Sequence, residues 1–228
     1  MQKLILGTAQ FGSNYGIKHD GQPSLQEIEK IAQVAWDGGI RVIHTSWQYN
    51  LPEICKKVFN EFEWITKDEH WSEYFHFRDK IGVSCYEKPD NAFKEWIDGF
   101  DILQVPINIL DNRWISKELW NKCEIHARSV FLQGLLLMEP EKMPDWIPID
   151  VKTMIFAFHF KCEVMNLRPY EAALGWVLGL EDIDYVIVGV NNAEQLRQLL
   201  EVKPLRWDYD FSIQDEMVLD PRKWPQCA

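Results

Sequence analysis

The sequence has no long hydrophobic run: no stretch of eighteen consecutive apolar residues occurs among its 228 positions, so we expect no membrane-spanning helix. The apolar stretch within Met1–Gly7 is also too short for a secretion signal. Basic residues are few, because 24 lysines and arginines stand against 35 aspartates and glutamates and leave a formal net charge of −11. Proteins that bind nucleic acid neutralise phosphates with clustered basic residues, and the sequence has no such cluster. We therefore expect neither nucleic acid nor a membrane as a partner.

Cysteine pairs with the spacing of metal or disulfide sites are missing as well. The chain has five cysteines, an odd number, and none belongs to a Cys-x-x-Cys pair. They are Cys55, Cys85, Cys123, Cys162 and Cys227. Isolated thiols at wide spacing are typical of the reducing cytoplasm. The pattern therefore predicts a soluble, cytoplasmic protein without a metal site.

Enough apolar sequence is present for one packed domain. Hydrophobic residues make up 46% of the chain, which supports a core of ordinary size and one domain over residues 1–228. Seven short, nearly continuous apolar runs have the length of strands that are buried on both faces, which is typical of a parallel sheet. They are Leu4–Thr8, Arg41–Ser46, Trp64–Thr66, Lys80–Cys85, Asp101–Val105, Glu124–Arg128 and Asp184–Gly189.

Helical segments separate these strands. In the first, Ser24 with Glu27 three residues later has the pattern of a capping box. The others are Pro52–Glu61, Pro89–Asp98, Ser116–Lys122, Val151–Met165, Pro169–Leu178 and Ala193–Glu201. Alternating strands and helices form either a closed barrel or an open doubly wound sheet. No Gly-x-Gly-x-x-Gly follows the first strand, so the dinucleotide-binding fingerprint of the open fold is absent, and an α/β fold of the (β/α)8 TIM-barrel type is favoured.

The interval from Asp68 to Asp79 breaks this repeat. Its twelve residues suffice for one short crossover at most and cannot hold a further strand together with its helix. Either the fourth βα unit is lacking, or Tyr74–Phe77 replaces it as a substitute strand, and the sequence leaves both open. The barrel is therefore expected to be shortened. Because an incomplete barrel exposes strand edges, a homodimer over the gap is one expected form.

A tyrosine and a lysine follow two neighbouring strands. Tyr49 comes soon after the strand that ends at Ser46, and Lys67 directly follows Thr66. The C-terminal ends of barrel strands share one mouth, so the two side chains can approach each other. An ammonium beside a phenol lowers the pKa of the phenol, which suits a proton donor to a carbonyl group. The same spacing also fits a surface tyrosine and an unrelated lysine.

Four sequence blocks occur in an order that a known family shows. They are LGTAQFG with Tyr15-Gly16-Ile17 after it (Leu6–Ile17), QVPINILD (Gln104–Asp111), HARSVFLQGLL (His126–Leu136) and IVGVNNAEQL (Ile187–Leu196). Together they resemble the aldo-keto reductase superfamily, and within it the bacterial subgroup found with polysaccharide-biosynthesis genes. The resemblance implies a (β/α)8 barrel that binds NADPH across the strand ends. It also implies a small carbonyl substrate, sugar-like in this subgroup.

The resemblance implies an altered catalytic set. Tyr49 stands where the family has its proton donor, and Lys67 where the family lysine lowers the pKa of that tyrosine. His44 replaces the aspartate that pairs with the lysine. The histidine of the family's fourth strand falls in the interval that is too short for that unit. Two functions therefore remain open: an NAD(P)H-dependent reductase, and a catalytically inactive relative that serves as a binding or scaffold protein.

The resemblance implies a more complete cofactor site. The matching positions are Gly7, Thr8, Ser84, Gln104, Ser129, Leu132, Gly134, Gly189, Asn191, Asn192 and Gln195. Gln104 matches the glutamine that holds the nicotinamide carboxamide in the family. Neither Asn191 nor Asn192 is basic, which weakens the expected preference for NADP over NAD and leaves the cofactor open between them.

Overall fold

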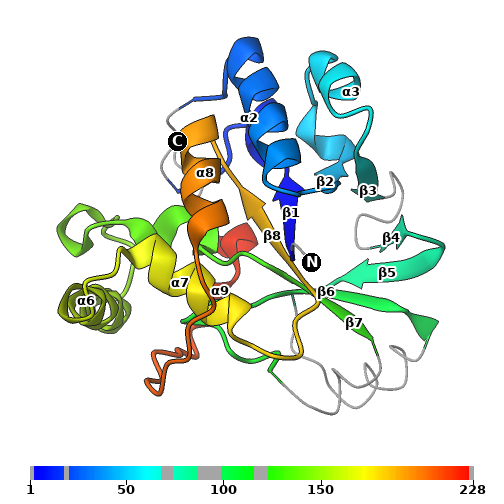
Figure 1. Cartoon of the computed structure of the whole chain (residues 1–228). Helices are drawn as coiled ribbons and strands as arrows, with labels where there is room; N and C mark the ends of the chain where they lie inside the picture. The colour runs from blue at the N-terminus through cyan, green and yellow to red at the C-terminus, as the bar shows by residue number, and fades with distance from the viewer. Residues whose placement is uncertain (1–2, 18–20, 68–73, 87–98, 116–122, 226–228) are drawn as a thin grey trace.

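The computed structural model describes residues 3–17, 21–67, 74–86, 99–115 and 123–225, without the side chains of residues 67 and 74–76. Within these ranges eight strands form a closed barrel in which each strand pairs with its neighbours in the chain (Figure 1). They are β1 (Leu4–Gly7), β2 (Val42–Ser46), β3 (Glu63–Lys67), β4 (Tyr74–Phe77), β5 (Lys80–Ser84), β6 (Ile102–Pro106), β7 (Glu124–Arg128) and β8 (Tyr185–Gly189). The seven strands expected from the sequence are all present, so the prediction of an α/β barrel is confirmed.

The fourth strand departs from the (β/α)8 arrangement. β4 runs antiparallel to both β3 and β5, whereas the other neighbouring strands pair in parallel. Arg78 and Asp79 join β4 to β5, and both have a left-handed φ, of 52° and 62°. Two consecutive left-handed residues are typical of a two-residue type I′ hairpin turn, whose twist matches that of the paired strands. The substitute-strand alternative is therefore confirmed.

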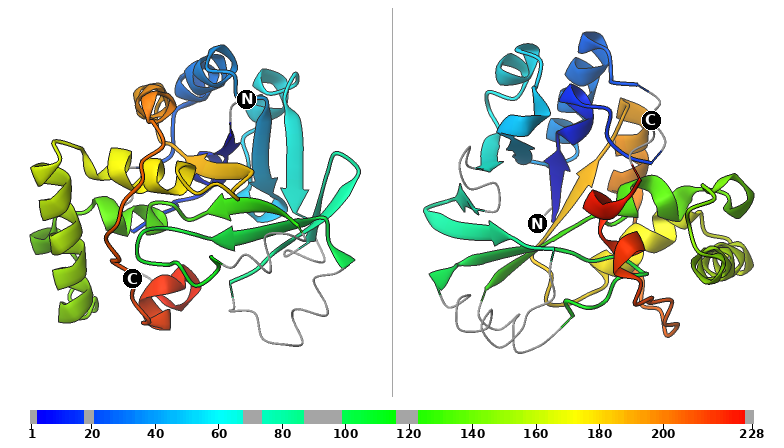
Figure 2. Two further views of the ribbon diagram at one scale, coloured as in Figure 1. Left: turned by 60° about the horizontal axis from the view of Figure 1, so that its bottom comes forward. Right: turned by 180° about the vertical axis from the view of Figure 1, so that it is seen from behind.

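The substitute strand also closes the wall. Because β4 pairs on both sides, the barrel has no open edge at this place. The expectation of exposed edges was wrong, and a homodimer loses the structural reason for which it was predicted. In each view the β4–β5 hairpin lies on the side of the barrel away from α6 (Ile149–Val164) (Figure 2).

The other described α-helices lie outside the barrel or at its ends. They are α1 (Ala9–Gly12), α2 (Leu25–Asp37), α3 (Ile54–Val58), α7 (Pro169–Leu178), α8 (Ala193–Glu201) and α9 (Glu216–Leu219). Short 3₁₀ segments are η1 (Trp47–Tyr49), η3 (Leu132–Leu137), η4 (Pro140–Lys142) and η5 (Pro221–Lys223). α7 and α8 have the predicted bounds, and α3 is shorter than predicted. The helices predicted at Pro89–Asp98 and Ser116–Lys122 lie outside the described residues. No helix in the described ranges is both long and apolar enough to cross a membrane.

The N-terminus of α2 contains half of the predicted capping box. The hydroxyl oxygen of Ser24 accepts a hydrogen bond from the Glu27 N–H at 3.2 Å, as a cap should. The carboxylate of Glu27 does not return to Ser24 but accepts from the backbone N–H of Ala193 at 2.8 Å. This second half of the prediction was wrong because α2 and α8 pack together, and the start of α8 offers a stronger partner for a carboxylate.

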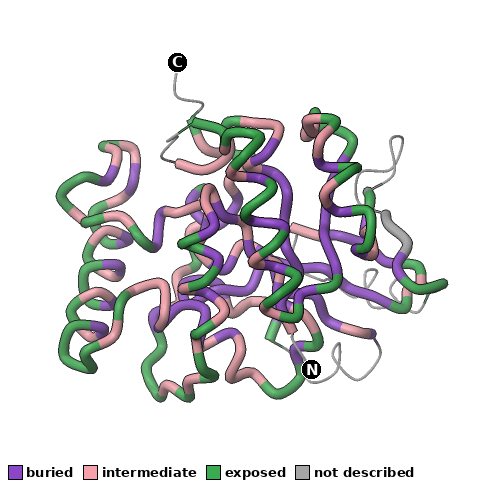
Figure 3. Tube along the Cα trace, turned by 45° about the horizontal axis from the view of Figure 1, so that its top comes forward, coloured by how far each residue is buried: buried purple, intermediate pink, exposed green. Residues whose placement is uncertain are grey.

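Buried side chains follow the barrel, while exposed residues lie on the outer helices (Figure 3). Inside the barrel, Phe77 of the reversed strand joins an apolar layer. The other fully buried members of this layer are Ile5, Val42, Ile65 and Ile102. Below this layer, towards the N-terminal strand ends, Glu124 pairs with Lys80 Nζ and lies 2.8 Å from His126 Nε2. The lower end of the barrel is therefore closed by a dry layer and a charged cluster.

This cluster predicts how stability depends on pH. Hydrogen bonds from His126 and then Lys80 lower the pKa of Glu124 from 4.5 to about 2, against the effect of burial. A carboxyl whose pKa is lowered by folding stabilises the fold above its unfolded pKa, and this stabilisation is lost as the pH falls through 4.5 to about 2. We expect Glu124→Gln to lower the free energy of unfolding at pH 7 by about 1–2 kcal/mol, because solvent screens this partly exposed carboxylate, measured by urea titration. The difference from the unmodified chain should shrink as the pH falls from 4.5 to 2. The exposed Glu141→Gln is the control and should change little at any pH.

Candidate functional site

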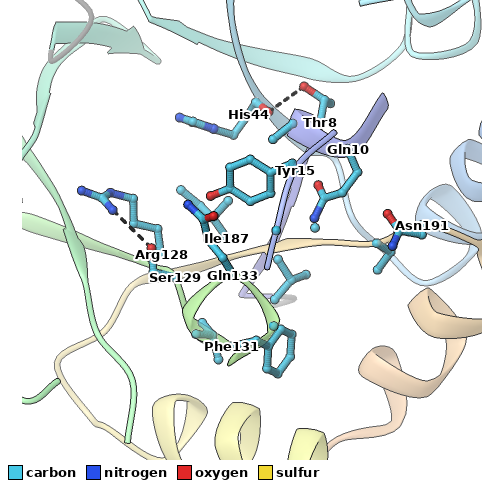
Figure 4. A pocket seen from close by; sticks show the side chains of 18 of the residues that line it. Thr8, Gln10, Tyr15, His44, Arg128, Ser129, Phe131, Gln133, Ile187 and Asn191 are labelled. Atoms are coloured by element: carbon cyan, nitrogen blue, oxygen red, sulfur yellow. Dashed lines mark hydrogen bonds between the residues drawn. The ribbon is translucent and has the colours of Figure 1, made fainter. Parts of the chain in front are cut away.

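A cavity of about 400 Å³ opens at the C-terminal ends of the strands (Figure 4). Most residues predicted for a site line it, from both ends of the chain. They are Gly7, Thr8, His44, Tyr49, Gln104, Ser129, Gly134, Gly189, Asn191 and Gln195. The barrel explains this convergence, because the ends of parallel strands meet at one mouth wherever they lie in the sequence.

Other predicted residues lie behind the lining or outside the description. Ser84 is buried, and its hydroxyl accepts a hydrogen bond from Arg128 Nε at 3.2 Å. Leu132 is fully buried in a cluster beside α6 and α7. Asn192 caps α8, where its side-chain oxygen accepts from the Gln195 N–H. The side chain of Lys67 is not among the described parts, so its approach to Tyr49 stays a prediction.

Gln104 is the most informative residue of the cavity. It lies on β6 two residues after Ile102, and alternation along the strand places both on the inner face. The side chain is fully buried, and neither its oxygen nor its nitrogen has a hydrogen-bond partner among the described residues. A buried amide without partners costs free energy. This amide can offer one donor and one acceptor to a ligand that carries an amide of its own.

Four of the described tyrosines line the cavity, and only Tyr49 was predicted. The others are Tyr15, from the loop after β1, Tyr86, which follows β5, and Tyr170 of α7. Burial raises the pKa of Tyr49, the Tyr86 phenol acts in the same direction, and the charge of Arg128 opposes them. The pKa of Tyr15 is also raised, mainly by burial. With the described groups around it, Tyr49 therefore keeps its phenol proton at neutral pH.

Arg128 was also missed by the sequence prediction. It is the last residue of β7. Its Nε and Nη1 donate to the hydroxyls of Ser84 and Ser129, both at 3.2 Å, and its Nη2 donates to the carbonyl oxygen of Cys85 at 2.7 Å. Its guanidinium carbon lies 3.7 Å from the centre of the Tyr86 ring. The alternation of β7 could have revealed it, because His126 two residues earlier lies inside the barrel.

The turn after β7 forms the floor beneath these side chains. Ser129, Gln133 and Gly134 all have a left-handed φ, of 58°, 51° and 93°. The carbonyl oxygen of Gln133 accepts from the N–H of Ile17 at 2.9 Å, which ties this turn to the loop after β1. A cluster of left-handed non-glycine residues is typical of functional turns that the surrounding fold holds in place.

The start of α8 is already occupied by side chains. Gln195 Oε1 accepts from the Asn191 N–H at 2.7 Å, and Glu27 Oε1 accepts from the Ala193 N–H at 2.8 Å. The N–H of Ala193 and then Lys30 lower the pKa of Glu27, which keeps its carboxylate charged. A helix N-terminus favours an anion, but here the chain supplies its own. A phosphate group at this place would meet a fixed negative charge.

Comparison with solved structures shows which known fold this is. The chain is similar to a glycerol dehydrogenase from Gluconobacter oxydans, with a TM-score of 0.61 and 14% identity over 95% of this chain and 89% of that one. It is also similar to a candidate aldo-keto reductase from Pseudomonas aeruginosa, with a TM-score of 0.53 and 14% identity over 89% and 90% of the two chains. No family model and no curated protein matches the sequence.

At this identity the likeness concerns the fold. The chain shares its α/β barrel fold with these two structures, and this supports the fold that the resemblance in the sequence implied. The subgroup, the altered catalytic set and the site roles stay predictions.

Proposed function

We propose that this chain is an NADH-dependent oxidoreductase of the aldo-keto reductase type, which reduces the carbonyl group of a small substrate with Tyr49 as proton donor. The observation that carries the proposal is Gln104 at the cavity, whose buried amide has no hydrogen-bond partner for either polar atom among the described residues. The barrel shared with two oxidoreductase-like structures supports the same class of reaction.

The cavity fits a nicotinamide cofactor at several points. Gln104 would hold the carboxamide, and the turn with Ser129 and Gly134 lies where the resemblance puts the pyrophosphate. A Cβ on Gly134 would meet no atom closer than 3.8 Å, so the turn leaves room above it. A bound nicotinamide supplies the hydride in this chemistry. The start of α8 fits the adenosine end without a 2′-phosphate, because Glu27 and Gln195 already bind its N–H groups.

Within the chain, Tyr49 has the properties of the acid. The phenol is protonated at neutral pH, as a proton donor must be before the step. Burial raises its pKa and so makes it a weaker acid, and nearby positive charge must offset this effect in the step itself. As the carbonyl oxygen gains negative charge, Tyr49 gives up the proton. The positive charge of Arg128 favours the resulting phenolate, since it acts on Tyr49 in the direction of a lower pKa.

The reversed strand favours a second candidate, a barrel that binds ligands without chemistry. A residue at the end of a parallel fourth strand would lie at the mouth, whereas β4 ends at Phe77, which pairs with Lys80 at the opposite end of β5. His44 also stands where the family has a carboxylate. If the chain has this second function, we expect it to bind cofactor without reducing any carbonyl compound. Turnover that depends on Tyr49 would exclude it.

Cofactor titration tests the proposal directly. Tryptophan fluorescence of the full chain should be quenched by NADH at lower concentration than by NADPH, and flat curves with both would remove the oxidoreductase function. We expect Glu27→Gln to lower the ratio of the NADPH and NADH dissociation constants about two- to fivefold, since a charge at a helix N-terminus is worth roughly 0.3–1 kcal/mol. Glu29→Gln, on the exposed side of α2, removes the same charge and should leave the ratio unchanged.

A further inference from the structure

Two arginines of this chain are almost fully buried, and among the described residues only one of them has a carboxylate partner. The side chain of Arg113 is 7% exposed and forms two hydrogen bonds, of 2.8 and 2.9 Å, with the carboxylate of the fully buried Asp111. Arg128 is 8% exposed, yet within the described ranges no carboxylate lies within ion-pair distance of it. A buried charge without a counterion costs free energy, so Arg128 requires an explanation beyond packing.

The described groups that contact Arg128 are all neutral. Two hydroxyls and one carbonyl oxygen accept from it, and Tyr86 covers one face of its plane. A guanidinium has five N–H donors. Since one N–H of each terminal nitrogen is used, one on each remains. Two N–H groups on neighbouring nitrogens of one plane match the two oxygens of a carboxylate.

Arg128 also belongs to the cavity and to the group of tyrosines. It lines the same 400 Å³ space as Tyr49 and Gln104. Figure 4 shows Arg128 and Ser129 rising from the end of β7 on the side towards which the Tyr15 hydroxyl points. Its charge affects both Tyr15 and Tyr49. An anion on Arg128 would therefore be held beside the proposed proton donor.

We propose that Arg128 is the anion subsite of this cavity and that the substrate is a small oxo acid, whose carboxylate binds Arg128 while its carbonyl group faces Tyr49. The carbonyl part of this inference rests on the proposed function. A bound NADH would supply the hydride for the new C–H bond at the carbonyl carbon, and the phenol proton of Tyr49 goes to the oxygen. The products are a hydroxy acid and NAD⁺, and the Tyr49 phenolate then regains its proton from water.

A neighbouring arginine provides a matched control. The guanidinium carbon of Arg222 lies 4.0 Å from the centre of the same Tyr86 ring, but Arg222 has its own carboxylate in Asp220, at 2.7 Å. Removing Arg222 takes away a cation near the cavity and leaves the proposed subsite intact. The pair Arg128→Gln and Arg222→Gln therefore separates a specific site from the general effect of positive charge.

The test is calorimetric titration of the full chain with oxamate, an oxo-acid mimic that is not reduced, with and without NADH. We expect Arg128→Gln to weaken oxamate binding at least about tenfold, the typical loss for one charged hydrogen-bond partner. Arg128→Lys should retain part of the affinity, and Arg222→Gln should retain all of it. Oxamide, which is uncharged, should bind no variant well. Inorganic phosphate should bind more weakly than oxamate, and tighter phosphate binding would overturn the assignment to an oxo acid.

Other results overturn the subsite without touching the proposed function. Oxamate binding that is absent from the unmodified chain, or unchanged in Arg128→Gln and Arg128→Lys, would do so even if NADH binds. Arg128→Gln with normal oxamate affinity but weakened NADH affinity would assign Arg128 to the cofactor instead. If oxamate binding depends on Arg128 while NADH fails to bind, the subsite stands and the oxidoreductase proposal falls. Thermal unfolding of each variant shows whether it is folded, and Arg128→Lys keeps the test valid if Arg128→Gln is not.

Discussion

Tyr49→Phe is expected to lower carbonyl reduction about 10²–10⁴-fold, the usual contribution of a positioned general acid. The change removes only the hydroxyl group, so the ring keeps its packing in η1 and the cavity keeps its shape. NADH affinity should stay within about twofold, since the loss of one hydroxyl that does not bind cofactor leaves that free energy nearly unchanged. Steady-state rates with an oxo acid, together with fluorescence titration of NADH, measure both quantities.

Tyr15→Phe is the matched control for this experiment. Tyr15 also has a phenol at the cavity and a raised pKa, but it comes from the loop after β1. It should lose far less activity than Tyr49→Phe. A larger loss in Tyr15→Phe would name Tyr15 as the proton donor, and equal rates in all three proteins would place the proton transfer elsewhere. The pH profile gives a second check, because a donor with a raised pKa should remain active well above neutral pH.

Gly12→Ala is expected to destabilise the fold and to disturb Tyr49 as well. Gly12 ends α1 directly against the backbone of η1. A Cβ at this position would lie 1.6 Å from the carbonyl oxygen of Tyr49 and 2.7 Å from the carbonyl carbon of Asn50. Both are backbone atoms, so no side-chain rotation can relieve the contact, and the chain around Tyr49 must move. Overpacking of this kind typically costs about 1–3 kcal/mol and sometimes more, and the upper end applies here.

Gly99→Ala is the control for Gly12→Ala, because a Cβ on Gly99 would meet no atom of the described residues within 4 Å. Urea unfolding should show a loss of about 3 kcal/mol for Gly12→Ala and little change for Gly99→Ala. The Gly12 variant should also reduce an oxo acid more slowly at temperatures where it remains folded. Unchanged stability would mean that α1 and η1 can separate without cost, and normal activity would mean that Tyr49 need not stay where it is.

The strands could be predicted from the sequence because each buried strand has its own continuous run of apolar residues. Continuous apolar runs identified seven strands, and helical periodicity gave the bounds of α7 and α8. No sequence pattern showed the direction of β4. Its turn has Arg78 and Asp79 in left-handed conformations, whereas such a hairpin turn usually contains glycine or asparagine. Only the pairing of β4 with both neighbours decides its direction.

The site could be predicted only in part for the same reason, because some of its contacts join residues that lie far apart in the sequence. The capping pattern at Ser24 is local and was predicted, but the partner of Glu27 lies 166 residues away in α8. A strand pattern shows that Arg128 is buried and does not show whether a carboxylate lies beside it. The contrast with Arg113, whose aspartate is two residues away, appears only when the barrel brings the strand ends together. The predicted residues were therefore those that a local pattern or a resembling sequence block identifies.

The hairpin of β4 and β5 also bears on how this protein can diversify. The ends of β3 and β4 that residues 68–73 connect both lie at the mouth, since Lys67 pairs with Phe75 and Tyr74 with Val83. In a regular barrel each segment leaving the mouth must lead into a helix, so its length is constrained by the packing of that helix. Here β4 pairs antiparallel with β3, and antiparallel neighbours need no crossover helix between them. Insertions or deletions at this junction can therefore reshape the rim while the strand pairing of the barrel is preserved. Variation among descendants of this chain should therefore concentrate at that junction, and with it their choice of substrate.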